Sequence, residues 1–279
     1  MAPNRNTLWG EVILEELAAA GVDAVVVAPG SRSTPLTVAA ARSDLRVYSH
    51  LDERSAAYFA LGRARRTGRP VPLICTSGTA AANFHPAVVE ASQSRVPMVL
   101  LTADRPPELQ DSGANQTVDQ EKLYGDAVRT YRTLPEPAPE PRRLRSLRTT
   151  VARAMATATG TPAGPVHLNA PFAKPLEPTE VSGDVPADLP ERAPLGAAGR
   201  DGPFVRTTVG RPTLDDDAVA DLAAALSAAD RGLLVVGPAN APTPARDALA
   251  ALAEATGFPV LADPLSGVRF GDHVAETPV

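Results

Sequence analysis

VDAVVVAP (22–29) is a short segment that is apolar at nearly every position, and the polar residues GSRS (30–33) follow it directly. A segment of this kind suits a strand covered on both faces, as in a parallel sheet with helices on either side. Similar segments recur along the chain as LRVYSH (45–50), VPLICT (71–76), VPMVLLTAD (96–104) and GPVHLNAP (164–171). The sequence therefore predicts an α/β fold, with an open parallel sheet and helices on both faces.

Alanine-rich amphipathic stretches separate these strands and predict helices. We expect helices over 7–20, 34–42, 53–66, 79–92 and 141–158. Gly21 directly follows the first of them and fits a helix C-cap. LPEPAPEP (134–141) is too rich in proline for either a helix or a strand, so it is expected to be an extended connector.

The composition changes near residue 175, where we place the end of a first domain, 1–175. Residues 176–212 are rich in Pro and Gly and predict a linker. A second, Rossmann-like α/β domain then begins, with helices over 214–229 and 244–256 and strands over 231–238 and 258–263. Because two strands cannot close a sheet covered on both faces, residues 213–279 are expected to be only part of that domain.

Charge and cysteine content exclude several classes of protein. The 279 residues are 44% hydrophobic and carry a formal net charge of −5, which argues against a nucleic-acid-binding surface. The lone Cys75 cannot form an internal disulfide, and no apolar signal stretch or membrane span is visible, so we expect a cytoplasmic protein. The scattered His residues and the absence of a phosphate-loop or nucleophile-elbow motif leave no support for zinc, P-loop or serine-hydrolase chemistry.

Polar clusters stand where the predicted strands end: PGSRS (29–33), DER (52–54), TSGTA (76–80) and ADRP (103–106). The carboxyl ends of parallel strands share one edge of a sheet, where such folds bind ligands. Glu53 is either an ordinary acidic residue in a first helical turn or a sheltered acid for proton transfer. Arg32 and Arg105 are either surface charges or forks for a carboxylate ligand.

Five segments read in order decide between these readings: APGSRSTPL (28–36), HLDERSAAYFALG (50–62), TSGTAAANFHPAVVEA (76–91), LLTADRPPELQDSGANQT (100–117) and GPVHLNAPF (164–172). Together they resemble the 2-succinyl-5-enolpyruvyl-6-hydroxy-3-cyclohexene-1-carboxylate synthase (MenD) family of thiamine-diphosphate enzymes. The resemblance covers residues 7–175. TSGTA and GPVHLNAPF occur in looser form in thiamine-diphosphate enzymes generally, whereas PGSRS, TADRPPEL and GANQ are more particular to this family.

The resemblance implies a role for each cofactor-facing residue. Glu53 matches the glutamate that hydrogen-bonds N1′ of the cofactor's pyrimidine, and the apolar residues that follow it are expected to shelter its carboxyl group from water. The first domain is then a pyrimidine-binding domain. Pro29, Thr76 and Asn83 match the lining of the aminopyrimidine pocket, although Thr76 and Asn83 fit equally well as hydrogen-bonding residues of a strand end and a helix.

The family's reaction decarboxylates 2-oxoglutarate and adds the succinyl-semialdehyde carbanion to isochorismate, in menaquinone biosynthesis. Both substrates are dianions, so arginine and amide donors are expected in the site. The residues that match substrate-facing positions of the family are Ser31, Arg32, Arg105, Asn115 and Gln116.

One part of the thiamine-diphosphate pattern is missing. These enzymes hold the diphosphate and its Mg²⁺ or Mn²⁺ with a GDG motif followed by a later Asn, and only Gly271-Asp272-His273, close to Val279, comes near it. We therefore expect no metal ligand in this chain, about half of a longer enzyme, and no activity from this part alone. The resemblance also implies a homodimer or homotetramer with active sites at subunit interfaces.

Two alternatives stay open. One is another thiamine-diphosphate enzyme, similar to acetolactate synthase or a decarboxylase, although PGSRS and GANQ count against it. The other is a noncatalytic pyrimidine-domain subunit that needs a separate partner. Arg95, in SRVPM, lies outside the clusters and is interpreted as a solvated residue, and the alternative is that it helps to bind an anionic regulator.

Overall fold

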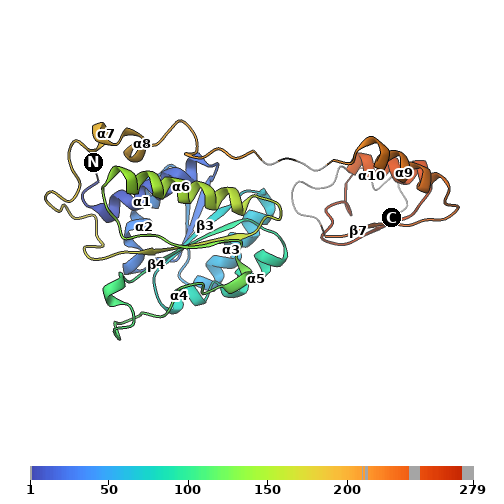
Figure 1. Cartoon of the computed structure of the whole chain (residues 1–279). Coiled ribbons are helices and arrows are strands. Elements are labelled where there is room, and N and C mark those ends of the chain that lie inside the picture. Colours follow the sequence, from blue (N-terminus) through green and yellow to red (C-terminus); the bar gives the residue numbers. More distant parts are fainter. Residues whose placement is uncertain (1, 209, 211–212, 239–245, 272–279) are drawn as a thin grey trace. The chain divides into compact units, whose positions relative to one another are not determined.

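The computed structural model describes residues 2–208, 210, 213–238 and 246–271. The chain divides into two compact units, Met1–Thr208 and Val209–Val279, which we describe separately (Figure 1). Of the features expected from the sequence, the first residues of helix 244–256 and the Asp272-His273 pair lie outside the described residues.

The first unit is built on a six-stranded sheet in the order β2-β1-β3-β4-β6-β5, in which all the pairings are parallel. The strands are β1 (Ala24–Val27), β2 (Arg46–Ser49), β3 (Val71–Cys75), β4 (Met98–Asp104), β5 (Tyr131–Thr133) and β6 (Pro165–Pro171). Every residue of β1, β3, β4 and β6 is buried, as expected for strands with helices on both faces. The predicted fold class is confirmed.

Strand β5 was not predicted. It has only three residues, of which Arg132 and Thr133 are exposed, and it pairs with β6 alone at the edge of the sheet. A half-exposed edge strand of this length has no apolar run, so hydrophobic patterning cannot detect it.

Helices cover both faces of the sheet (Figure 1). The core on one face includes residues of α1 (Arg5–Ala19), α2 (Thr34–Arg42) and α6 (Pro141–Ala158), and the core on the other face includes residues of α3 (Glu53–Thr67), α4 (Thr79–Ala82) and α5 (His85–Gln93). The predicted helix 79–92 is wrong as a single element. Pro86 stands in the first turn of α5, where its missing N–H costs nothing, but in one continuous helix it would break the hydrogen-bond ladder.

Helix α1 begins earlier than expected because Asn4 caps it. The Asn4 side chain accepts a hydrogen bond from the Thr7 amide, and the helix therefore starts at Arg5. At the other end, Gly21 has φ +95°, a conformation that favours glycine, and its predicted place just after the helix is confirmed.

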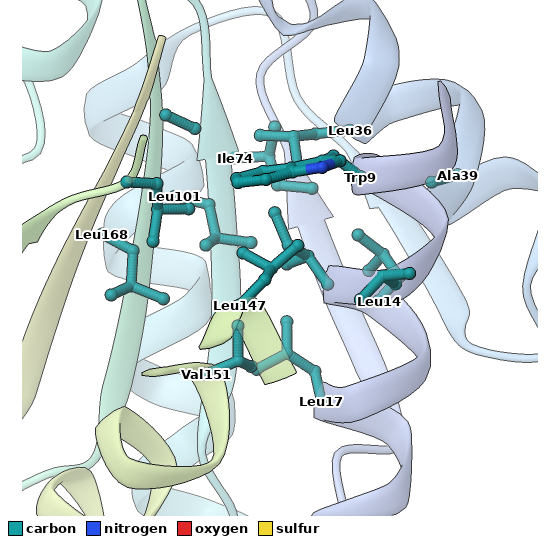
Figure 2. Close-up of a cluster of buried hydrophobic side chains, with 14 of the residues drawn as sticks. Trp9, Leu14, Leu17, Leu36, Ala39, Ile74, Leu101, Leu147, Val151 and Leu168 are labelled. Atoms are coloured by element: carbon teal, nitrogen blue, oxygen red, sulfur yellow. The ribbon is translucent and has the colours of Figure 1, made fainter. Parts of the chain in front are cut away.

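Figure 2 shows the core beneath α1, α2 and α6, where Trp9 and Leu147 lie among leucine side chains from the sheet and the helices. Full burial of each such side chain stabilises the fold by about 1.5–3 kcal/mol. The Trp9 indole also donates to the Ala138 carbonyl across 2.8 Å. This bond fastens the proline-rich connector 134–141 to the first helix.

The first part of the segment predicted as a linker packs on the first unit. It contains the short helices α7 (Leu189–Arg192) and α8 (Pro194–Ala197), and Leu176, Leu189 and Ala193 belong to the core. The buried Arg148 of α6 donates to the Gly196 carbonyl at 2.8 Å and to the Ala197 carbonyl at 3.0 Å.

The second unit contains α9 (Asp216–Ser227), β7 (Leu234–Val236), α10 (Arg246–Thr256) and β8 (Val260–Ala262). The two strands pair in parallel, which agrees with the predicted second α/β unit. Val235 is 71% exposed and Leu261 is 56% exposed, so these strands lack the double covering of the first sheet.

Candidate active site

The parallel register brings the predicted polar clusters to one edge of the sheet. Cys75, the last residue of β3, pairs with Thr102 of β4, and Asp104 at the end of β4 pairs with Pro171 of β6. The loops that leave β1, β3 and β4 therefore start side by side.

Arg32 is a buried cation at this edge, 6% exposed. Its Nη1 donates to the Phe172 carbonyl at 2.5 Å, and its amide donates to the Thr76 hydroxyl at 3.3 Å. Its Nε is buried without a hydrogen-bond partner. Burial first, and then the nearby Arg105, lower the pKa of Arg32 below its ordinary value.

The loop after β1 can approach the end of β3 closely because residue 30 is glycine. A Cβ on Gly30 would lie 2.6 Å from Cβ of Thr76, far inside van der Waals contact. The loop between β1 and α2 can therefore rest on the end of β3, which places the Arg32 amide on the Thr76 hydroxyl.

Arg105 is half-buried and fixed by two hydrogen bonds. Its Nη1 donates to the Ser77 hydroxyl at 2.8 Å, and its Nη2 donates to the Asn115 carbonyl at 2.6 Å. Neither Arg105 nor Arg32 forms an ion pair with any carboxylate in the part of the chain that the structure describes. Two neighbouring cations without a paired carboxylate form a site suited to an anion.

The GANQ turn reaches the same edge. Gln116, at φ +55°, donates from Nε2 to the Ser77 carbonyl at 3.1 Å, and the Ser77 hydroxyl donates back to the Gln116 carbonyl at 3.1 Å. The Asn115 residue is exposed, and it contacts Arg105 through its carbonyl. The structure thus brings Asn115, Gln116 and Arg105 together.

Glu53 is the first residue of α3, whose N-cap Asp52 accepts from the Ser55 amide at 2.7 Å. The Glu53 residue is partly exposed and lies close enough to the buried Cys75 to raise the pKa of that thiol, although burial is the larger cause. Among the described residues no side chain pairs with the Glu53 carboxylate. The carboxylate is therefore available at the sheet edge.

The apolar residues after Glu53 were expected to shield its carboxyl group from water, and only some of them are buried in this chain. Ala56, Ala57 and Leu61 are buried, but Tyr58 is 46% exposed and Phe59 is 37% exposed. Tyr58 and Phe59 therefore lie outside the buried face of α3 in this chain.

The remaining predicted residues lie at or near the edge in different environments. Pro29 and Ser31 are exposed in the loop after β1. The Thr76 hydroxyl is occupied by the Arg32 amide, and exposed Asn83 donates to the Thr79 carbonyl at 2.8 Å within its own helix turn. Thr76 and Asn83 therefore each make a hydrogen bond within the protein, which is the structural alternative that the sequence analysis left open.

Arg95 does not belong to this edge. It is exposed and precedes β4, at the amino end of that strand, whereas the site lies at the carboxyl ends of the strands.

A buried polar network beneath the edge escaped the sequence analysis. It consists of Thr102, Asp104, Gln120, His167 and Asn169, each at most 3% exposed. Asn169 donates to Asp104 at 2.7 Å, and Thr102 bonds both Asn169 and His167 at 2.7 Å. The sequence feature that could have indicated this network is the pair His167 and Asn169, two polar residues inside the otherwise apolar strand GPVHLNAP.

Burial perturbs two titratable groups of this network. Burial raises the pKa of Asp104, although hydrogen bonds from Asn169 and the Arg105 amide oppose the shift. Burial lowers the pKa of His167 to about 3, so the imidazole is neutral at pH 7.

Neither a metal centre nor a membrane span emerges from the described residues. No group of three or more His, Cys, Asp or Glu side chains there could hold a metal ion. No helix among them is long and apolar enough to cross a membrane.

Comparison with protein families finds one matching model. Residues 9–123 match the N-terminal thiamine-pyrophosphate-binding domain of thiamine pyrophosphate enzymes. The match includes the loops after β1, β2, β3 and β4, and therefore every predicted site residue.

Curated relatives match along the whole chain. The 2-succinyl-5-enolpyruvyl-6-hydroxy-3-cyclohexene-1-carboxylate synthase of Halorubrum lacusprofundi is 69% identical over 279 residues, which are 100% of this chain and 45% of that relative. The enzyme of the same name from Roseiflexus castenholzii is 51% identical over 276 residues, which are 96% of this chain and 47% of that relative. The chain thus spans about half the length of the curated relatives it matches.

A solved structure has the same fold. The thiamine diphosphate-dependent 4-hydroxybenzoylformate decarboxylase of Rhodococcus jostii RHA1 matches 92% of this chain and 44% of its own, with a TM-score of 0.71 and 24% identity.

Proposed function

We propose that this chain, which belongs to the thiamine pyrophosphate enzymes and among them to the 2-succinyl-5-enolpyruvyl-6-hydroxy-3-cyclohexene-1-carboxylate synthase family, supplies the pyrimidine-binding part of such a synthase. The reaction would decarboxylate 2-oxoglutarate and join the remaining four-carbon unit to isochorismate. The observation that carries the proposal is the Glu53 carboxylate, which has no side-chain partner among the described residues and stands at the same sheet edge as Arg32 and Arg105, which pair with no carboxylate there.

Glu53 is the proposed catalytic residue. When bound, thiamine diphosphate supplies the nucleophilic carbon that attacks the 2-oxo acid. The Glu53 carboxyl group holds a proton at N1′ of the pyrimidine, for which it must be free of a protein partner, as it is among the described residues. Pro29, Thr76 and Asn83 are proposed to line the pyrimidine pocket.

Arg32 and Arg105 are proposed to bind the carboxylates of the substrates. The orphaned Nε of Arg32 retains an unused donor, and a desolvated charge-assisted hydrogen bond contributes about 1.5–3 kcal/mol. Ser31 follows β1 and Asn115 and Gln116 follow β4, at the same edge of the sheet, and they would add hydroxyl and amide contacts. This donor set fits two dianionic substrates better than it fits pyruvate, which carries one charge.

The remaining features of the active site are proposed from the relatives' greater length. The diphosphate and its Mg²⁺ or Mn²⁺ would be held by ligands outside this chain, and the enzyme would be a homodimer or homotetramer with active sites at subunit interfaces. Exposed apolar side chains support this arrangement, namely Leu51, which is 94% exposed, with Tyr58 and Phe59. A partner surface over them would also shelter Glu53 from water.

We also propose a cytoplasmic location, consistent with the single, buried and unpaired Cys75.

The test uses the complete enzyme, which we define as this chain together with the diphosphate-binding part found in such a synthase. Purified enzyme with thiamine diphosphate and Mg²⁺ is given either 2-oxoglutarate with isochorismate or pyruvate alone. We expect carbon dioxide and the joined product from the first pair. Turnover of pyruvate at a comparable rate would instead favour an acetolactate-synthase-like enzyme.

A further inference from the structure

Gln120 is a buried amide at the centre of the polar network, 1% exposed. Its Oε1 accepts from the Gly78 amide at 2.7 Å. Its Nε2 donates to Oδ1 of Asn169 at 2.8 Å and to the Ala103 carbonyl at 3.2 Å. One side chain thus joins the turn after β3 to the ends of β4 and β6.

Charge fixes the direction of these hydrogen bonds. The two oxygens of Asp104 accept from the Arg105 amide and from Nδ2 of Asn169, each at 2.7 Å. Because Nδ2 of Asn169 faces Asp104, its Oδ1 must face donors, and Nε2 of Gln120 is one of them. Oε1 of Gln120 is then left for the Gly78 amide, so a residue here must donate at one atom and accept at the other.

The turn held by Gln120 also holds the substrate-binding arginine. Gly78 has φ +79°, and a Cβ there would lie 2.9 Å from Gln116, so this turn needs glycine and packs closely against Gln116. The preceding residue, Ser77, accepts from Arg105 and exchanges two hydrogen bonds with Gln116. The second acceptor of Arg105, the Asn115 carbonyl, lies on the segment that leads to Gln120.

We propose that Gln120 is a positioning residue that holds Arg105 in its substrate-binding geometry, by anchoring both segments that carry the acceptors of the Arg105 guanidinium. Gln120 itself touches neither the cofactor nor a substrate. The inference rests on the proposed function, in which Arg105 binds a substrate carboxylate. It adds a residue that the family resemblance did not identify.

The decisive variant is Gln120→Glu, which keeps the size and an acceptor oxygen but loses both donated bonds. Gln93→Glu on the exposed end of α5 is the charge-matched control. Leu147→Ala, in the core on the opposite face of the sheet, controls for loss of stability alone. Each variant is assayed in the complete enzyme at a temperature where all of them remain folded.

We expect Gln120→Glu to raise KM about tenfold for whichever substrate Arg105→Ala affects, with a smaller change in kcat. In the Arg105→Ala background the same substitution should change KM less than about twofold, because its effect passes through Arg105. Both controls should leave KM unchanged. The inference would be overturned if Gln120→Glu raised KM by the same factor in the parent enzyme and in Arg105→Ala. It would also be overturned if Gln120→Glu left KM unchanged.

A second measurement does not depend on turnover. Hydrogen–deuterium exchange in this chain should be faster at Gly78 and at 113–117 in Gln120→Glu than in Gln93→Glu, with little change in α1. If Arg105→Ala leaves every KM unchanged, the proposed function of Arg105 fails, while faster exchange at these amides still supports the anchoring by Gln120. Unchanged exchange there would overturn that anchoring in either case.

Discussion

Nη1 of Arg105 lies 2.8 Å from Oγ of Ser77, and that hydroxyl in turn donates to the Gln116 carbonyl at 3.1 Å. Ser77 is buried, so its hydroxyl is a fixed acceptor for Arg105, and together with the Asn115 carbonyl it holds the guanidinium in one orientation. A side chain held in this way before the substrate arrives loses little conformational entropy on binding.

Arg105→Ala should therefore weaken substrate binding without preventing folding. Loss of a charge-assisted hydrogen bond of about 1.5–3 kcal/mol corresponds to roughly a tenfold or greater rise in KM for 2-oxoglutarate or isochorismate. The affinity for thiamine diphosphate should change much less. Arg105→Lys should recover only part of the loss, because an ammonium cannot reproduce the planar fork that reaches Ser77 and Asn115. Equal losses of cofactor and substrate affinity would indicate a structural role instead.

Arg32→Ala should reduce both substrate binding and stability. The variant removes one of the two cations of the site and also leaves the buried Phe172 carbonyl without its donor, which costs about 1–3 kcal/mol. Urea unfolding of this chain measures the second effect, and steady-state kinetics of the complete enzyme measure the first. A stability loss with unchanged KM would remove Arg32 from the substrate site.

Gly30→Ala tests the close approach of the loop to the end of β3. Gly30 has extended backbone, at φ −164°, so alanine is acceptable there on conformational grounds, and only the contact with Thr76 opposes it. The forced displacement should cost about 1–3 kcal/mol of unfolding free energy. Gly62→Ala is the matched control, because nothing lies within 4 Å of its added Cβ and the site is inside α3. That control should stabilise the chain by about 0.5–1 kcal/mol. A Gly30→Ala chain as stable as the parent would contradict the described packing.

His167 should make the chain sensitive to acid. Its pKa is about 3 when folded, against an ordinary 6.5, so the unfolded chain binds a proton at higher pH than the folded one. The contribution to stability is complete above about pH 6.5 and is lost as the pH falls toward 3, at roughly 1.4 kcal/mol per pH unit at most. Urea unfolding at pH 4, 5 and 7 should show a smaller fall in His167→Gln than in the parent. The exposed His85→Gln should behave like the parent, and an identical pH dependence in His167→Gln would contradict this prediction.

Sequence patterning was enough to find the fully buried strands and the edge at which they end. VDAVVVAP and VPMVLLTAD are apolar at nearly every position because helices cover both their faces, and α6 begins at Pro141 and ends at Ala158 as predicted. The short strand β5 was missed because it has no apolar run, and the break before α5 was missed although Pro86 marks it in the sequence.

The candidate site was predictable only in outline. Strand ends placed Arg32 and Arg105 at one edge, but Gln120 stands in a polar loop whose local sequence, TVDQEK, gives no sign of burial. Its role depends on partners 42 and 49 residues away in the chain. Hydrogen bonds between segments so distant cannot be read from local sequence.

The most direct test of the account is the turnover of 2-oxoglutarate and isochorismate by the complete enzyme carrying Glu53→Gln. The glutamine side chain of this variant has nearly the same shape as that of the native glutamate, but it cannot hold a carboxyl proton at N1′. We predict that product formation is abolished, while the unfolding midpoint of this chain stays close to that of the parent. Near-normal turnover by the folded variant would contradict the assignment of Glu53 as the catalytic residue.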